Sequence, residues 1–454
     1  MFEKAGYSFH LREIVYFLLV LAVLFSGWQL SGNFIYFHDI RGWYFPAAVM
    51  FLLFLFRDRI YAPKKSLALF MAGIAGSSAL TATLYHTNPA QTLIQMTAFA
   101  LVVTFAYSIM RTLGHELLNT ALLDAAVIIA VSVVCHELLH IIKPGLGQLV
   151  FGGRNQKLGF LVRAKGLLGE QSWGGIFLGP PTFVALRRKS RARHILLAAA
   201  SALTFSLLTY ISLLLAYGMY FLTVERKPKG RRKGFTVSKR VIVAGVALLF
   251  LFIVGFNAAP ITERIKAGLY SAGLFSVVNN GGATMTEFYK MAGSVATLTV
   301  NSLVAISAIK GTHGLGVGFG NFEQAYRDFS PAFMPLGYNG NGLFYSAFGG
   351  GSLWIRAAAE LGLAGLVALV LLHYYAVRRY MKLASDRKRK SPGQMDYMTA
   401  VGLGIIIMAV YCIRKDVWIN LFFCLSLVMV FSPEFSGGAA DRSDPASMES
   451  GDAR

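Results

Sequence analysis

Charged residues are scarce in this chain, and acidic residues are scarcer than basic ones. Only 14% of the 454 residues are charged, whereas 55% are hydrophobic, and the mean hydropathy is +0.55. Soluble globular domains carry about 25% charged residues. The composition therefore excludes an ordinary soluble protein, and the long apolar runs predict an all-α polytopic membrane protein.

Cysteine is almost absent. Cys135, Cys412 and Cys424 are the only three, and each lies inside an apolar run. We therefore expect all three to be buried core residues and expect no disulfide framework.

The shortage of acidic residues leaves a formal net charge of +21, from 43 Lys and Arg against 22 Asp and Glu. A charge of this size would suit nucleic acid, but the basic residues cluster directly after apolar segments. The clusters lie at 57–65, 187–193, 225–240 and 378–390. This is the pattern that keeps short loops in the cytoplasm, so it predicts membrane topology and no nucleic-acid partner.

Run length and loop charge together predict about 12 transmembrane helices with both termini in the cytoplasm. The expected spans lie near 14–32, 44–56, 66–85, 90–110, 117–142, 172–186, 194–205, 207–223, 241–258, 353–377, 396–413 and 416–432. The stretch 194–223 fits either one long tilted helix or two short ones. Basic runs flank it on both sides, which favours a hairpin that turns near Phe205–Tyr210.

Residues 1–432 are expected to form a single membrane domain, and the Ser-, Gly- and Asp-rich tail 433–454 is expected to be disordered and cytoplasmic. A large outside loop, about 259–352, separates the ninth and tenth spans. Loops of this length are usually functional.

The first candidate for chemistry is the sequence CHELLH. His136 and His140 lie one helical turn apart with Glu137 between them, a spacing that suits zinc with the glutamate as general base. A zinc protease of the membrane also needs a third ligand, which such families usually supply as the aspartate of an Asp-Gly pair. No Asp-Gly pair occurs in the chain. The alternatives are a polar role near an active cavity and hydrogen bonding within the helix bundle.

The second candidate is RAKGLLGEQSWGG at 163–175, just before a predicted span. It contains two cations, Arg163 and Lys165, and one carboxylate, Glu170. Ser172 could cap the following helix, and a helix N-terminus there would attract an anion.

The third candidate is the glycine-rich segment 311–320, GTHGLGVGFG. Its glycines permit tight curvature with backbone N–H groups available for an anion. Candidate acid–base groups are His313, Glu323 and Asp328, and candidate cations are Arg327, Arg356 and, at the end of the eleventh span, Arg414.

These segments resemble a known family. RAKGLLGEQS at 163–172 resembles the R-x-x-G-L-F-x-E-P-S/N stretch of bacterial Wzy-type O-antigen and exopolysaccharide polymerases, a family that includes the O-antigen ligases. GLGVGFG at 314–320 resembles the P-L-x-G-x-G-x-G segment that follows their large periplasmic loop, and AELGLAG at 359–365 matches their E-x-G-x-x-G span.

The chain departs from the family pattern at three places. Gln171 stands where proline is usual, and Asn301 stands where many members have arginine. The stretch 338–352 lacks the histidine typical of O-antigen ligases, which favours a polymerase over a ligase.

The resemblance implies a glycosyltransferase that joins polyprenyl-pyrophosphate-linked oligosaccharide repeat units at the periplasmic face of the bacterial inner membrane. The expected general bases are Glu170, His313 and Glu323, in that order. The expected pyrophosphate-binding residues are Arg163 and Arg356, then Arg327 and Arg414. Gly314, Gly316 and Gly318 are expected to shape the loop. No metal or cofactor is expected, since the chain has no D-x-D pattern.

The partners implied are the lipid-linked oligosaccharide, the lipid bilayer, a chain-length regulator and export machinery. Three alternatives stay open. The first is an O-antigen ligase that transfers finished glycan to a lipid or protein acceptor. The others are the zinc metalloprotease and a transporter of lipid-linked sugars.

Overall fold

A computed structural model describes part of the chain. The described residues are 2–26, 65–85, 88–151, 157–158, 161–162, 164–168, 170–223, 298, 300–330, 351–385, 391–415 and 417–432. The predicted spans 44–56 and 241–258, the tail 433–454 and most of the predicted loop 259–352 lie outside these residues.

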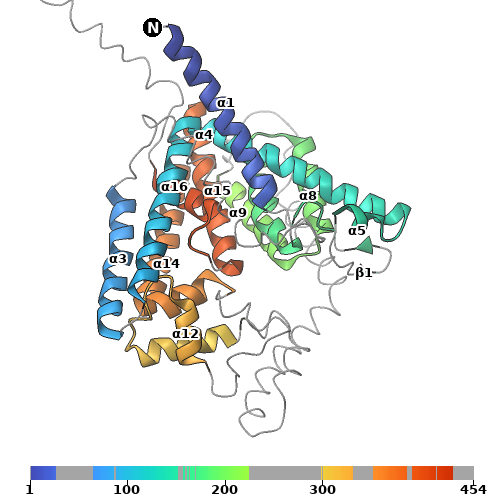
Figure 1. Ribbon diagram of the computed structural model, residues 1–454. Helices are drawn as coiled ribbons and strands as arrows, with labels where there is room; N and C mark the ends of the chain where they lie inside the picture. Colours follow the sequence, from blue (N-terminus) through green and yellow to red (C-terminus); the bar gives the residue numbers. More distant parts are fainter. Residues whose placement is uncertain are drawn as a thin grey trace, which may run out of the picture.

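The regular structure in the described residues is helical apart from one short hairpin (Figure 1). The helices are α1 (Phe2–Ser26), α3 (Lys65–Tyr85), α4 (Pro89–Ile142), α5 (Leu146–Phe151), α6 (Gly174–Phe177), α7 (Gly179–Arg187), α8 (Arg191–Leu203), α9 (Leu207–Thr223), α12 (Phe322–Phe329), α14 (Leu353–Ser385), α15 (Pro392–Arg414) and α16 (Leu421–Phe431). A further apolar helix covers Val300–Gly311. The hairpin pairs β1 (Lys157–Leu158) with β2 (Leu161–Val162) in antiparallel fashion.

Four helices are long and apolar enough to cross a membrane, namely Ala68–Tyr85 within α3, α4, α14 and α15. Their outward surfaces are apolar too. On α14, Leu363, Val367 and Leu371 repeat every four residues, and each is more than half exposed. A stripe of this kind would be unfavourable in water but suits lipid chains. The chain is therefore a helical membrane protein.

Helix α4 is 54 residues long and bends at Gly114, where φ is 71° and ψ is 173°. A straight helix of this length would measure roughly 80 Å, more than twice the ~30 Å hydrocarbon thickness of a bilayer. The bend divides α4 into 89–113 and 115–142, and each part is long enough to span. These parts correspond to the predicted spans 90–110 and 117–142.

The stretch 194–223 forms two helices rather than one. Helix α8 ends at Leu203 and α9 begins at Leu207. Phe205, in the turn between them, has a φ of 44°. The Tyr210 hydroxyl closes the turn by donating to the carbonyl oxygen of Ala202 at 2.9 Å. The expected turn therefore occurs, at the beginning of the predicted interval.

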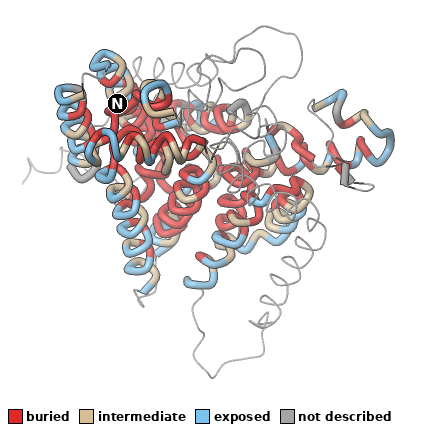
Figure 2. The backbone as a smooth tube through the Cα atoms, turned by 90° about the horizontal axis from the view of Figure 1, so that it is seen from below, coloured by how far each residue is buried: buried red, intermediate tan, exposed pale blue. Residues whose placement is uncertain are grey.

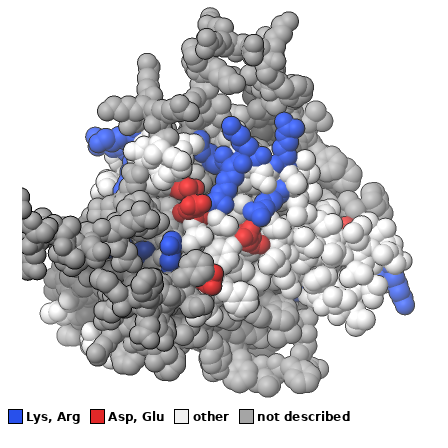
Figure 3. Space-filling view, turned by 90° about the horizontal axis from the view of Figure 1, so that it is seen from above, with Lys and Arg blue, Asp and Glu red and all other residues white. Residues whose placement is uncertain are grey.

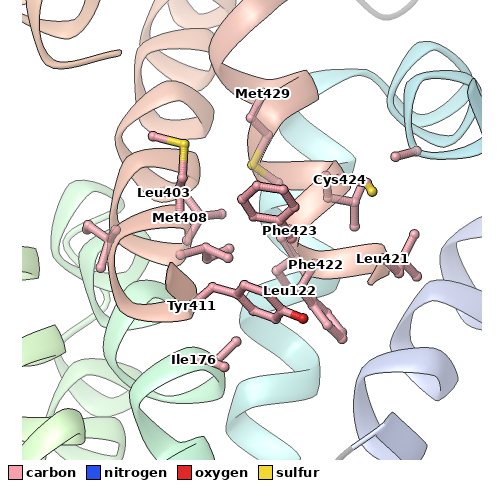
Figure 4. Close-up of a cluster of buried hydrophobic side chains, with 14 of the residues drawn as sticks. Leu122, Ile176, Leu403, Met408, Tyr411, Leu421, Phe422, Phe423, Cys424 and Met429 are labelled. Atoms are coloured by element: carbon pink, nitrogen blue, oxygen red, sulfur yellow. The ribbon is translucent and has the colours of Figure 1, made fainter. Parts of the chain in front are cut away.

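The core lies where α15 and α16 pack against α4 and α7 (Figures 2 and 4). Tyr411 and Phe423 stack with ring centroids 5.5 Å apart, and Phe177 meets Phe422 edge to face at 4.9 Å. Cys412 and Cys424 are buried in this core. The expectation of a buried thiol is wrong for Cys135, which is exposed on the outward surface of α4.

The end of the bundle that carries the N-terminus is rich in basic side chains (Figure 3). Two ion pairs hold helices together there: Arg193 lies 3.1 Å from Asp124, and Arg188 lies 3.8 Å from Asp396. We call this end the basic face. The glycine segment and α12 lie at the opposite end (Figure 1), which we call the motif face because it also carries 164–173, 352–363 and 412–420.

Candidate functional site

The glycine-rich segment docks on an interruption in α14. Gly362, inside that helix, has a φ of 61° and a ψ of −147°, so the helical hydrogen bonding breaks at this point. The freed backbone groups pair with the glycine segment instead. The N–H of Leu363 donates to the Gly314 carbonyl at 2.9 Å, and the N–H of Gly318 donates to the Glu360 carbonyl at 2.7 Å.

Two glycines make this close approach possible. A Cβ atom on Gly362 would lie 2.0 Å from the carbonyl oxygen of Gly314. A Cβ atom on Gly316, where φ is 78°, would lie 2.6 Å from the Glu360 carbonyl oxygen. Both distances are far inside van der Waals contact. The G-x-G-x-G segment and the E-x-G turn therefore interlock backbone against backbone, which no larger residue permits.

The interlock uses the N–H groups that the sequence suggested for anion binding. Gly314 donates to Ile309 at 2.7 Å, and Gly316 donates to the Thr312 hydroxyl at 2.8 Å. Val317 donates to Ala359, and Phe319 donates to the Ser78 hydroxyl. These amides are satisfied within the protein. The segment acts as a rigid joint here, and the expectation of an open amide cradle at these positions is wrong.

A buried ion pair lies directly beneath the interlock. Glu360 is fully buried and accepts from Arg356 Nε at 2.7 Å. Its second oxygen accepts from Trp418 Nε1 at 2.9 Å, and the backbone N–H of Phe322 lies 3.3 Å from the first. A carboxylate in this position links α14, the start of α12 and the turn between α15 and α16.

A second, exposed charge cluster lies at the end of α15. Arg414 reaches Glu170 at 3.4 Å, and the Ser172 hydroxyl donates to the same carboxylate oxygen at 3.1 Å. Lys415 Nζ lies 3.6 Å from the centre of the Trp173 ring, a cation–π contact. Ser172 does not cap the following helix as expected: Trp173 occupies the N-cap position of α6.

The turn from Cys412 to Asn420 joins the two clusters. Arg414 and Lys415 contact the 170–173 segment, and Trp418 contacts Glu360. The Ser352 hydroxyl donates to the Cys412 carbonyl at 2.8 Å. Segments far apart in the sequence thus meet at one turn on the motif face.

The other predicted acid–base residues lie on the α3 side of the glycine segment. His313 is exposed, with Nδ1 3.4 Å from the Tyr85 hydroxyl. Glu323 pairs with Arg327 one turn further along α12, and both side chains are substantially exposed. The structure shows no direct contact between these residues and the Glu170–Arg414 pair. Arg163 lies outside the described residues.

The described arginines predicted to bind pyrophosphate share one property. Each already faces a glutamate: Arg356 pairs with Glu360, Arg414 with Glu170, and Arg327 with Glu323. Their exposures differ, since the Arg356 side chain is 9% exposed whereas Arg414 is 36% and Arg327 is 65% exposed. Arg414 and Arg327 can therefore reach a ligand without leaving a buried partner unpaired.

The CHELLH residues lie near the end of α4 beneath α5 and β2. His136, Glu137 and His140 are all buried, at 2%, 3% and 5% exposure. Glu137 accepts the backbone N–H of Val162 at 3.1 Å. Within the part of the chain that the structure describes, His, Cys, Asp and Glu form no group of three that could hold a metal ion. The zinc alternative therefore lacks a described ligand set.

Three residues of this face were not singled out as functional by sequence reasoning. Glu360 and Lys165 lie in the motifs at 359–365 and 163–175, but the motifs alone gave neither residue a role. Trp418 carried no signal, because a tryptophan near a membrane surface is common. The sequence did contain one clue to Glu360. It follows Arg356 by four residues at the start of a predicted span, and residues with this spacing lie on one face of a helix.

Comparisons with known proteins add no identification. No protein-family model matches the chain, and no curated protein matches it significantly. The motifs and the geometry of the motif face therefore carry the functional argument.

Proposed function

We propose that this protein is a polysaccharide polymerase that joins oligosaccharide repeat units linked to polyprenyl pyrophosphate. One observation supports the proposal above others. Segments 164–173 and 352–363 contact the 412–420 turn through Glu170, Glu360 and Ser352. Segment 311–323 contacts the same turn through Phe319, whose ring centroid lies 5.4 Å from that of Trp418. Motifs that resemble one enzyme family in order and spacing thus form one charged face at the end of a membrane bundle.

The orientation follows from the charges. We assign the basic face to the cytoplasm, because short basic loops stay on that side of the membrane. The motif face is then periplasmic, in the inner membrane. A lipid-linked substrate would present its pyrophosphate at this depth, with its sugars in the aqueous space beyond.

The reaction requires a base and a stabiliser of negative charge. A hydroxyl of the acceptor sugar attacks the anomeric carbon of the donor, and the bond from that carbon to the pyrophosphate oxygen breaks. Glu170 takes the hydroxyl proton, and polyprenyl pyrophosphate leaves with the bonding electrons. Glu170 suits this role because its carboxylate is half exposed and is oriented by the Ser172 hydroxyl.

The arginines have two roles in this proposal, charge neutralisation and positioning. Arg163 and Arg414 neutralise the charge that develops on the leaving pyrophosphate, with Arg327 as a further contact on α12. Arg356, through Glu360 and Trp418, fixes the turn that carries Arg414. His313 and Glu323 are the next candidates for the base.

The first test replaces Arg163 by alanine. We expect the polymer to disappear and single lipid-linked repeat units to accumulate, because the leaving group loses its cation. Protein level and topology should stay as in the wild type, measured by immunoblot and by labelling of single cysteines. Normal polymer length in this variant would remove Arg163 from the mechanism. Long unattached chains in a deletion strain would point to the ligase alternative.

The second test replaces Glu170 by glutamine. The amide still accepts the Ser172 hydrogen bond but cannot take a proton, so kcat should fall about 100-fold or more, the usual contribution of a general base, with little change in KM. The measurement is product formation from purified lipid-linked repeat units. Glu116→Gln, an exposed glutamate near the basic face, serves as the control. If Glu323→Gln loses activity while Glu170→Gln retains it, the base is Glu323.

A further inference from the structure

Within the described residues, the buried lysine Lys165 has no acidic partner. The Lys165 side chain is only 5% exposed, and no carboxylate of the described chain lies within ion-pair distance of it. Burial lowers the pKa of Lys165 below its ordinary value, since a desolvated ammonium is unfavourable. A ligand that brings negative charge to this lysine would stabilise its charged form.

The neighbours of Lys165 also have unused hydrogen-bonding capacity. Neither ring nitrogen of His136 has a hydrogen-bond partner in the described chain, and the same holds for Nδ1 of His140 and Oε2 of Glu137. Coulombic interactions link Lys165 to His136, His136 to His140, and His140 to Glu137. The four side chains therefore form one cluster, which contains a basic group, Lys165, and an acidic group, Glu137.

Leaving buried polar atoms unsatisfied is costly, and each such atom requires an explanation, such as a bound water or ion or a catalytic role. Backbone contacts between the 164–168 segment and α4 hold this cluster in place. The N–H of Leu167 donates to the Ser132 hydroxyl at 2.9 Å, and a Cβ on Gly166 would lie 2.5 Å from the backbone nitrogen of Val133. The segment 164–168 is thus pressed onto α4, with Lys165 fixed beside His136.

Helix α5 covers the His136 part of this cluster. The Phe151 ring stacks on His136 with centroids 5.3 Å apart. A Cβ on Gly147 would lie 2.6 Å from the His136 carbonyl oxygen. Leu149 and Val150, on the outward side of α5, are exposed. Helix α5 therefore covers His136 with close contacts, and it presents an apolar outward surface of the kind that suits lipid chains.

We propose that Lys165 and His136, with His140, form a second phosphate-binding subsite, which holds the pyrophosphate of the acceptor substrate. The proposal rests on the proposed function, because joining two lipid-linked oligosaccharides brings two pyrophosphates to the enzyme and only one leaves. Arg163 and Arg414 serve the leaving group, and the Lys165 subsite serves the retained one. Glu137, the acidic member of the cluster, accepts a hydrogen bond from a hydroxyl of the sugar attached to that pyrophosphate.

A binding experiment tests the subsite without requiring polymerisation. The full chain is placed in nanodiscs of phosphatidylcholine, and inorganic pyrophosphate is titrated by calorimetry. We expect saturable binding that weakens roughly tenfold or more in Lys165→Met, since a charge-assisted contact is lost, and in His136→Gln. Lys310→Met is the matched control, because Lys310 is an exposed lysine beside the glycine segment; its affinity should stay within about twofold of the wild type.

Thermal unfolding separates this role from a structural one. Without ligand, Lys165→Met should melt at a higher temperature than the wild type, because the variant removes a buried cation that lacks a partner. Pyrophosphate should raise the melting temperature of the wild type and of Lys310→Met, but not of Lys165→Met. A lower ligand-free melting temperature in Lys165→Met, together with unchanged affinity, would overturn the proposal. If that variant does not fold, His136→Gln gives the same comparison.

A second arm distinguishes the source of the phosphate. In nanodiscs that contain phosphatidylglycerol, competition that depends on Lys165 would assign the subsite to a phospholipid headgroup and overturn its assignment to the substrate. The two proposals can also fail separately. If a deletion strain still makes polymer of normal length while Lys165→Met loses pyrophosphate binding, the polymerase proposal falls and the phosphate-binding site stands without its assignment to the acceptor substrate. If Lys165→Met binds pyrophosphate and polymerises as the wild type does, the subsite alone falls.

Discussion

Replacing Glu360 by alanine is expected to destabilise the protein by about 3–5 kcal/mol, the usual cost of removing one partner of a buried ion pair. The variant leaves the Arg356 guanidinium and the Trp418 indole N–H without the carboxylate that both now contact. Since domains are stable by only about 5–15 kcal/mol, this loss is a large part of the margin, and the unfolding temperature should fall clearly. The measurement is the unfolding temperature in detergent, together with the folded yield.

The exposed ion pair on α12 provides a matched control. Glu323 and Arg327 have the same spacing of four residues as Arg356 and Glu360, but their side chains are 40% and 65% exposed. Glu323→Ala should therefore cost less than about 1 kcal/mol. The double variant Arg356→Met with Glu360→Leu should recover part of the loss, because no unpaired charge remains. Equal destabilisation by Glu360→Ala and Glu323→Ala would contradict the burial argument.

Replacing Gly362 by alanine is expected to cost about 3 kcal/mol or more, from backbone strain and steric overlap together. The backbone of Gly362 occupies a region of φ and ψ that is almost restricted to glycine. The added methyl group would also lie 2.0 Å from the Gly314 carbonyl oxygen. The glycine segment would have to leave α14, so a polymerase of the kind proposed above should lose its polymer along with its stability. Unfolding temperature and polymer length measure the two effects.

Two further glycines calibrate this prediction. Gly314→Ala should be milder, because the added Cβ meets only the end of the Leu363 side chain at 3.4 Å, although its φ of 92° still imposes strain. Gly393→Ala is the control: nothing lies within 4 Å of its Cβ position, and alanine is a better helix former than glycine. A Gly362→Ala protein as stable as Gly393→Ala would show that the interlock does not exist.

Sequence reasoning identified the helical class of the described residues because apolar run length is a local property. It anticipated the all-α class and the separation of α8 from α9. It missed the exposure of Cys135, because an apolar run shows that a segment is buried in the membrane but not which side of the helix faces lipid. It also predicted that backbone N–H groups of the glycine segment would bind an anion. A sequence does not show that these groups donate hydrogen bonds to Ala359, Glu360 and Ser78 instead.

The site was anticipated as a set of motifs but not as a set of pairs. Glu170 and Arg414 are 244 residues apart, and Trp418 and Glu360 are 58 apart. No local pattern encodes either contact. Lys165 illustrates the same limit: its position beside an arginine suggested a cation cluster, whereas its burial next to His136 depends on how the 164–168 segment packs on α4.

The sequence by itself determined that this is a helical membrane protein with a basic end, because hydropathy and loop charge act on each segment independently of the others. The tertiary structure decided which charges are already neutralised and which are not. It paired Arg356, Arg414 and Arg327 with glutamates, whereas it buried Lys165 without an acidic partner among the described residues. The physical reason is that pairing and desolvation depend on distances between segments, and these distances are fixed only when the helices pack.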